Sequence, residues 1–209
     1  MLRQHKLRLN VEKCTFGMGA SKFLRYLITN QGIEANPNQI EAVNRLRPPS
    51  NPKEVQVLTE MLVALNRFIS KFADRCRPFY QLLRKWKGFQ WDEEYDKAFR
   101  DLKEHLTQAP MLTAPNSREN LFMYLSMSDH AVSAVLLRDR GIQQPVYYIS
   151  KTLVDVETRY LRLEKLVLAL VHATRKLPHY FQAHTVFVLT KYPLQSLLKR
   201  SDFIGRIAK

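Results

Sequence analysis

Cysteine is scarce in this sequence, and long apolar runs are missing. The two cysteines, Cys14 and Cys76, lie far apart and have no second Cys/His pair at metal-ligand spacing, which excludes a disulfide framework and a zinc knuckle. No stretch of about 18 apolar residues occurs, which argues against a membrane-spanning helix. Residues 1–13 mix Arg, His, Lys and Glu instead of an apolar signal block. We therefore expect an intracellular protein, of the cytoplasm or nucleus, without a membrane partner.

Positive charge is unevenly distributed along the chain. Residues 1–88 contain 16 Lys and Arg against 6 Asp and Glu, residues 89–209 contain 17 against 13, and the net charge is +14. A basic surface favours contact with nucleic-acid phosphates, which releases counterions and makes binding depend on salt. A solvated basic surface, or a missing acidic partner region, explains the same charge equally well. Charge alone therefore leaves these alternatives open.

Capping patterns and apolar spacing predict a helical first half. Asn36-Pro37 and Asn51-Pro52 each place an Asn cap before a proline at the first helical position, with Gln or Glu at the third. The second of these helices is predicted to continue for many turns, because apolar residues recur at spacings of three and four. This stripe consists of Val55, Leu58, Leu62, Leu65, Ile69, Phe72 and Cys76.

Three basic residues lie at steps of four within that second helix. Arg67, Lys71 and Arg75 are predicted to form a ridge on its exposed side. A ridge of this kind is usually solvated, but it adds to an already basic half, so the three residues are candidates for phosphate contact. After Pro78 a short apolar helix leads to a junction at Gly88, where we place a domain boundary.

The second half combines helices with strands. A helix opens at Asp92, and three successive strands are predicted over 121–125, 131–137 and 146–149. A long helix over 160–177, a short strand over 186–189 and a helix from Pro193 follow. The strand over 186–189 is continuously apolar, which predicts burial on both faces. The fold class is therefore α+β: a helical segment followed by a mixed β-sheet flanked by helices.

Several short motifs follow one another in a set order along the chain. Phe89-Gln90-Trp91 and Ala109-Pro110, with apolar residues between them, resemble the start of the RNase H-like region in the Pol polyproteins of gypsy-type LTR retrotransposons. Residues 12–16 and 23–28 look like the end of a reverse-transcriptase palm, and residues 66–79 like the thumb and connection. The resemblance implies three parts: the end of a palm over 1–35, thumb and connection helices over 36–88, and an RNase H-like domain over 89–209, truncated at its carboxyl end.

The resemblance also implies a polymerase whose catalytic acids are absent here. Polymerases of this family hold two magnesium ions with a Tyr-x-Asp-Asp turn and a further palm aspartate, and no two aspartates are adjacent in this chain. Without those carboxylates, phosphoryl transfer has no metal clamp, so we expect no polymerase activity. The family implies RNA, DNA or an RNA–DNA hybrid as partners, together with the palm and fingers of a longer polyprotein.

RNase H chemistry in this family needs acidic side chains that hold two metal ions about 4 Å apart. The first acid precedes a Gly-Ala-Val-Leu run, which reads Ser-Ala-Val-Leu over 133–136, so its position is Ser126. The second lies in Glu-Lys-Glu-x-Leu-Ala on the long helix, where Leu166 takes its place. Glu164 survives, but two residues along a helix turn the side chain by about 200°, away from the site.

The third acid of the family is the aspartate of Thr-Asp-His after the last strand. This chain reads Thr190-Lys191-Tyr192, so Lys191 reverses the charge at that position. A fourth acidic position would lie beyond Lys209. We therefore expect no metal site and no cofactor, although active family members use magnesium.

The leading interpretation is a retroelement-derived module that binds RNA, DNA or their hybrid by shape and charge but does not cut. The tentative nucleic-acid-binding residues are Arg67, Lys71, Arg75 and Lys191. Lys191 is the one candidate that stands where a metal is held in active relatives, which suggests contact with a phosphate there.

Two other interpretations remain open at this point. An active ribonuclease H would borrow acids from another chain or use a relocated set, and it predicts binding of Mg²⁺ or Mn²⁺; the relocated set would be drawn from Asp129, Asp155, Glu157 and Glu164. A decayed remnant with little stable fold would explain Glu60 in an apolar-rich helix and Pro178 near the end of the long helix.

Overall fold

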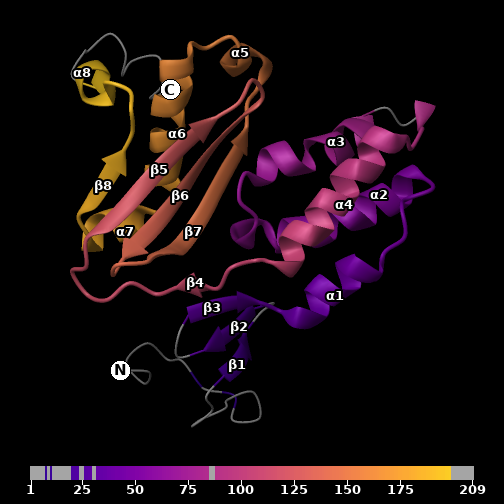
Figure 1. The fold of residues 1–209 in the computed structure, drawn as a ribbon, viewed down its shortest axis with the longest axis horizontal. Helices are drawn as coiled ribbons and strands as arrows, with labels where there is room; N and C mark the ends of the chain where they lie inside the picture. Colours follow the sequence, from indigo (N-terminus) through magenta and orange to yellow (C-terminus); the bar gives the residue numbers. More distant parts are fainter. Residues whose placement is uncertain are drawn as a thin grey trace.

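The first sheet gathers strands from two distant parts of the chain. The computed structural model describes residues 8, 10, 20–23, 26–29, 32–84 and 88–198. Strands β1 (Ala20–Phe23), β2 (Tyr26–Thr29) and β3 (Gly32–Ala35) follow one another antiparallel, and β4 (Leu112–Thr113) pairs with β3 from much later in the sequence (Figure 1). Gly32 is required there, because a Cβ would lie 2.1 Å from the carbonyl oxygen of Leu112.

Helices form the middle of the molecule, as the sequence predicts. They are α1 (Pro37–Arg45), α2 (Pro52–Ala64), α3 (Phe72–Arg84) and α4 (Glu93–Thr107). Both predicted capped starts are confirmed: the Asn36 side chain accepts a hydrogen bond from the Asn38 N–H, and Asn51 accepts one from the Glu54 N–H. The apolar faces of all four helices share one core with β3 and β4.

The prediction of a single long helix after Asn51 is wrong. It is broken into α2, a short 3-10 turn η3 (Asn66–Phe68) and α3, and Lys71 between them has a φ of +52°. Nearly all of the predicted apolar stripe is nevertheless buried, because the break lets α3 fold back against α2 so that both halves face the same core. Pro78 lies inside α3 instead of starting a new helix, so the carbonyl of Asp74 receives no bond from it.

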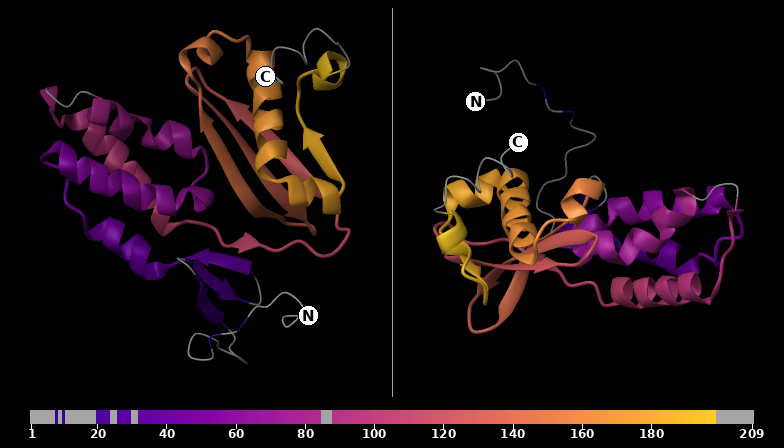
Figure 2. Two further views of the ribbon diagram at one scale, coloured as in Figure 1. Left: turned by 180° about the vertical axis from the view of Figure 1, so that it is seen from behind. Right: turned by 90° about the horizontal axis from the view of Figure 1, so that it is seen from above.

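The second sheet has the mixed topology that the sequence predicts. Strands β5 (Leu121–Met127), β6 (Ala131–Asp139) and β7 (Gln143–Thr152) form an antiparallel meander, and β8 (Val186–Leu189) pairs parallel with β5, giving the order β7-β6-β5-β8. Helices α6 (Arg162–Lys176) and α7 (Pro178–Ala183) pack on one face, as Figure 2 shows. The short helices α5 (Asp155–Thr158) and α8 (Leu194–Leu198) complete this part.

Strand β8 corrects the prediction of burial on both faces. It lies at the edge of the sheet, and its side chains alternate: Val186 and Val188 pack toward the helices, whereas Phe187 and Leu189 are 46% and 37% exposed. The opposite face of β5 and β8 carries no helix (Figure 1). An apolar run of four residues does not distinguish a central strand from an edge strand, because only the neighbouring elements decide what covers each face.

The connection between the two sheets belongs structurally to the first half. Helix α4 contributes Phe99, Leu102 and Leu106 to the first core, and β4 completes the first sheet, so the second core begins only at Leu121. The domain boundary expected at Gly88 stays a prediction. In the part of the chain that the structure describes, none of the helices is both long and apolar enough to cross a membrane.

The two residues that suggested a decayed fold have ordinary places in the structure. Glu60 is exposed on α2, where its carboxylate accepts a hydrogen bond from Gln56 Nε2 at 3.1 Å. Pro178 is the first residue of α7, a position that needs no backbone N–H donor. Neither residue opposes the fold.

Candidate functional site

The three residues predicted to replace the family's metal ligands line one cavity. Ser126 lies near the end of β5, Leu166 lies on α6, and Lys191 follows the end of β8. All three line a cavity of about 590 Å³ at the carboxyl ends of these two strands. These three elements are far apart in the sequence. They come together because β8, which follows α6 in the chain, pairs parallel with β5.

The cavity does not fit a divalent metal ion. Among the described residues that line it, Lys191 is the only charged one, and hydroxyls are the only side-chain oxygens. These lining residues are Tyr124, Leu125, Ser126, Met127, Leu166, Leu189, Thr190, Lys191 and Tyr192. Magnesium prefers carboxylate oxygens, and a nearby ammonium group repels it. These residues therefore do not hold Mg²⁺, and no metal-dependent step follows from them.

The acidic residues that a relocated metal site would use do not converge in the structure, and two of them already have hydrogen-bond partners. Glu164 accepts a hydrogen bond from the Leu161 N–H at 2.8 Å, caps α6, and is not among the described residues that line the cavity. Glu157 accepts from the Val154 N–H at 3.0 Å and is paired with Lys151. Across residues 32–84 and 88–198 no three His, Cys, Asp or Glu side chains lie close enough together to hold a metal ion.

The predicted basic ridge is absent, because its three residues no longer lie on one helix. The guanidinium of Arg67 lies between the rings of Tyr26 and Tyr147, at 5.0 and 4.6 Å from their centres, and its Nε is buried without a hydrogen-bond partner. Arg75 donates from Nε to the carbonyl of Ser70 at 3.0 Å. Arg67 thus joins the first sheet to the second, and nucleic-acid contact by Arg67 and Arg75 stays a prediction.

Lys71 lines a second cavity on the face of the second sheet opposite α6 and α7, where η3 and α3 pack on β6 and β7. This cavity has a volume of about 270 Å³ and is lined by Ser70, Lys71, Tyr124, Leu125, Ser126, Ser133, Ala134, Val135 and Tyr148. It shares Tyr124, Leu125 and Ser126 with the cavity that contains Lys191. Of the four candidate binding residues, the structure therefore brings Lys71 and Lys191 to adjoining cavities.

Lys165, next to Leu166, is a buried lysine that the sequence analysis did not single out. The Nζ of Lys165 donates to the carbonyl oxygens of Ser128 at 3.3 Å and Asp129 at 3.1 Å, which hold the turn between β5 and β6. The Ser128 hydroxyl donates to Asp74 on α3 at 2.6 Å. The only sequence signal is a lysine within the apolar part of α6, because its partners are backbone atoms that no side-chain pattern reveals.

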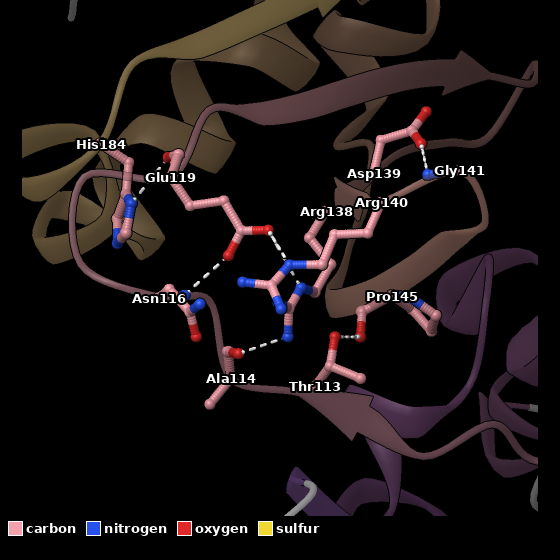
Figure 3. Close-up of polar contacts among 10 residues, drawn as sticks. All are labelled: Thr113, Ala114, Asn116, Glu119, Arg138, Asp139, Arg140, Gly141, Pro145 and His184. Atoms are coloured by element: carbon pink, nitrogen blue, oxygen red, sulfur yellow. Dashed lines mark hydrogen bonds and ion pairs between the residues drawn. The ribbon is translucent and has the colours of Figure 1, made fainter.

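A polar cluster at the other end of the second sheet holds the segment between β4 and β5 (Figure 3). Glu119 is paired with Arg138 at 3.2 Å and with Arg140 at 3.1 Å, and it accepts a hydrogen bond from the Asn116 N–H at 2.7 Å. Arg138 also donates to the carbonyl of Ala114 at 2.9 Å. Since these charges satisfy one another, we assign the cluster to structure.

The fold and the position of the cavity define an RNase H-like domain. Residues 91–188 match the family described as the RNase H-like domain found in reverse transcriptase. Over these residues the chain resembles that RNase H-like domain, and over most of its length it is similar to the Pol polyproteins of retrotransposons.

Individual relatives agree with this family. The Pol polyprotein of transposon 297 from Drosophila melanogaster is 29% identical over 94% of this chain and 18% of its own length. The polyprotein of transposon opus from the same species is 29% identical over 100% of this chain and 22% of its own length. The chain thus spans about a fifth of these relatives.

A solved structure shares the fold. A foamy viral protease-reverse transcriptase in complex with RNA/DNA hybrid superposes with a TM-score of 0.74 at 20% identity, over 94% of this chain and 28% of the viral one. At this level of identity the likeness concerns the fold alone.

Proposed function

We propose that this chain binds nucleic acid, in particular an RNA–DNA hybrid, through an RNase H-like domain that does not cleave. One observation carries the proposal: the three residues predicted to replace the family's metal ligands line one cavity, and they present a hydroxyl, an apolar side chain and a cation. Two-metal hydrolysis needs carboxylates that converge on the scissile phosphate. A lysine there attracts a phosphate directly but activates no water.

The charge of the chain and a solved relative support the choice of partner. The net charge is +14, and most of the excess lies in residues 1–88. A basic excess of this size favours binding to a phosphate backbone, which carries many negative charges, over binding to an acidic small molecule. The foamy viral enzyme of the same fold was solved with RNA/DNA hybrid bound. Recognition of a hybrid by shape and charge needs no catalytic acid, so loss of cleavage leaves binding possible.

A cleavage and binding assay tests this proposal. We expect the protein to bind a labelled RNA–DNA hybrid in a salt-dependent way and to leave the RNA strand intact with Mg²⁺ or Mn²⁺. Lys191→Glu should weaken binding and lower the salt slope by about 0.9 for one lost phosphate contact. Metal-dependent cleavage by the wild type, abolished by Glu157→Gln or Asp129→Asn, would instead establish a relocated active site.

A variant with restored acids serves as the matched control. Ser126→Asp, Leu166→Glu and Lys191→Asp together place three carboxylates around one cavity. We expect this variant, unlike the wild type, to bind Mg²⁺ in calorimetry, because converging carboxylates supply the oxygen ligands that the ion prefers. Absence of binding in the folded variant would contradict the assignment of these positions.

A further inference from the structure

The face of the second sheet opposite α6 and α7 carries a groove that runs between two lysines, beside the part of β6 and β7 that η3 and α3 cover. The cavities that contain Lys71 and Lys191 adjoin each other at Tyr124, Leu125 and Ser126, which line both. Helices α6 and α7 pack on the opposite face, so no helix covers this side of β5, and only Leu166 of α6 reaches the groove, in the cavity that contains Lys191 (Figures 1 and 2). We call the two cavities together the open-face groove.

The charges of the open-face groove have one sign. Of the lining residues in the described part of the chain, only Lys71 and Lys191 are charged, and both are exposed. Asp74 at the start of α3 accepts a hydrogen bond from the Ser128 hydroxyl at 2.6 Å and does not line the groove. A groove with lysines toward its two ends and no carboxylate suits a chain of phosphates that passes along it.

Aromatic rings lie between and beside the two lysines. Tyr124 is 40% and Tyr192 42% exposed, and Phe187 is exposed on β8, where it stacks on Phe122 at 5.7 Å between ring centres. The hydroxyl of Tyr124 accepts a hydrogen bond from Gln143 Nε2 at 3.2 Å, which restricts the ring. The bases of a duplex already stack on one another, so an exposed ring cannot stack on their faces. An unpaired base has a free face on which such a ring can stack.

We infer that the open-face groove binds single-stranded nucleic acid, with Lys71 and Lys191 on the phosphates and Tyr124 stacked on a base. The inference rests on the proposed function, because it names a second form of the same partner, bound beside the position of the former metal site. Lys71 has a left-handed φ of +52°, so its place at one end of the groove is set by the backbone break between η3 and α3. Single strands and hybrids would then share Lys191 only.

Fluorescence anisotropy with labelled oligothymidylate, an unstructured single strand, tests the inference on the whole chain. Tyr124→Leu should weaken binding about tenfold, the effect of losing one base stack, whereas Tyr124→Phe keeps the ring and should bind like the wild type. Lys71→Asn removes the charge with a residue that tolerates a positive φ, and it should lower the salt slope by about 0.7. Lys53→Gln, an exposed change on α2 outside the groove, is the matched control.

Hybrid binding measured on the same variants separates the two proposals. Tyr124→Leu should leave hybrid affinity within about twofold of the wild type, because stacking on Tyr124 needs unpaired bases. A wild type that binds hybrid but not oligothymidylate overturns this inference and leaves the proposed function standing. Equal loss of both ligands in Tyr124→Leu also overturns it, and a wild type that binds neither overturns both.

Discussion

Replacing Glu119 with glutamine tests whether the polar cluster stabilises the RNase H-like domain. The Glu119 carboxylate is shared by two guanidinium groups, and one oxygen accepts the Asn116 N–H (Figure 3). Glutamine keeps the shape and an acceptor but removes the charge. The amide offers one oxygen where the carboxylate offered two, so either the arginines or the Asn116 N–H lose an acceptor. The buried Arg138, whose Nη2 already has no hydrogen-bond partner, also loses its counter-charge.

The magnitude follows from burial. The Glu119 and Arg138 side chains are 13% and 9% exposed, whereas Arg140 is 54% exposed and screened by water. Breaking a fully buried pair costs about 3–5 kcal/mol, and breaking an exposed pair costs about 1 kcal/mol or less. We therefore expect Glu119→Gln to lower the free energy of unfolding by about 2–3 kcal/mol, which lowers Tm by about 4–12 °C in a chain of this size.

Urea unfolding of the single and double variants measures this energy. Arg138→Met combined with Glu119→Gln should cost at least about 1 kcal/mol less than the sum of the two single changes, because the double variant leaves no buried charge unpaired. Additive single changes, or a loss below about 0.5 kcal/mol for Glu119→Gln, would refute the reasoning from burial.

The same pair makes stability depend on pH. Burial raises the pKa of Glu119, but the Asn116 N–H and the two arginines outweigh it, so the pKa lies below its ordinary value of 4.5. An acid with a lowered pKa adds stability that is complete above that ordinary value and is lost as the pH falls through the folded-state pKa. The difference between wild type and Glu119→Gln should therefore shrink as the pH falls below 4.5.

Three further changes test other contacts. Arg67→Leu should lower the free energy of unfolding by about 1–3 kcal/mol, from two lost cation–π contacts, without changing the salt slope of hybrid binding. Lys165→Met should speed amide exchange over 128–130 and cost about 2 kcal/mol, since two carbonyls lose a charged donor. Burial raises the pKa of Cys76 to about 12, so its thiol should resist iodoacetamide at pH 8 until the protein unfolds.

Much of the fold could be predicted because it depends on local patterns. The capping residues Asn36 and Asn51 start helices as expected, and the meander of β5 to β7 follows from alternating apolar residues. The break at Lys71 could not be predicted, because apolar spacing of three and four continues through it. Only the packing of α3 against α2 favours two helices over one.

The candidate site divides in the same way. The motifs around Ser126, Leu166 and Lys191 predict that these residues replace family acids, and the structure brings all three to one cavity. The prediction of a basic ridge was wrong because it assumed that one helix continues through the break at Lys71. Tyr124 and the adjoining cavity at Lys71 were missed because they depend on which face of β5 lacks a helix.

By itself the sequence determined the lineage, the order of most helices and strands, and the absence of acids at three positions, since all of these lie in residue identity and short-range spacing. The tertiary structure decided which charges are available. It places Arg67 between two tyrosine rings, Lys165 under a turn, and Lys71 and Lys191 at the open-face groove. The reason is physical: charge is a property of the residue, whereas its burial and its partners are set by elements distant in the sequence.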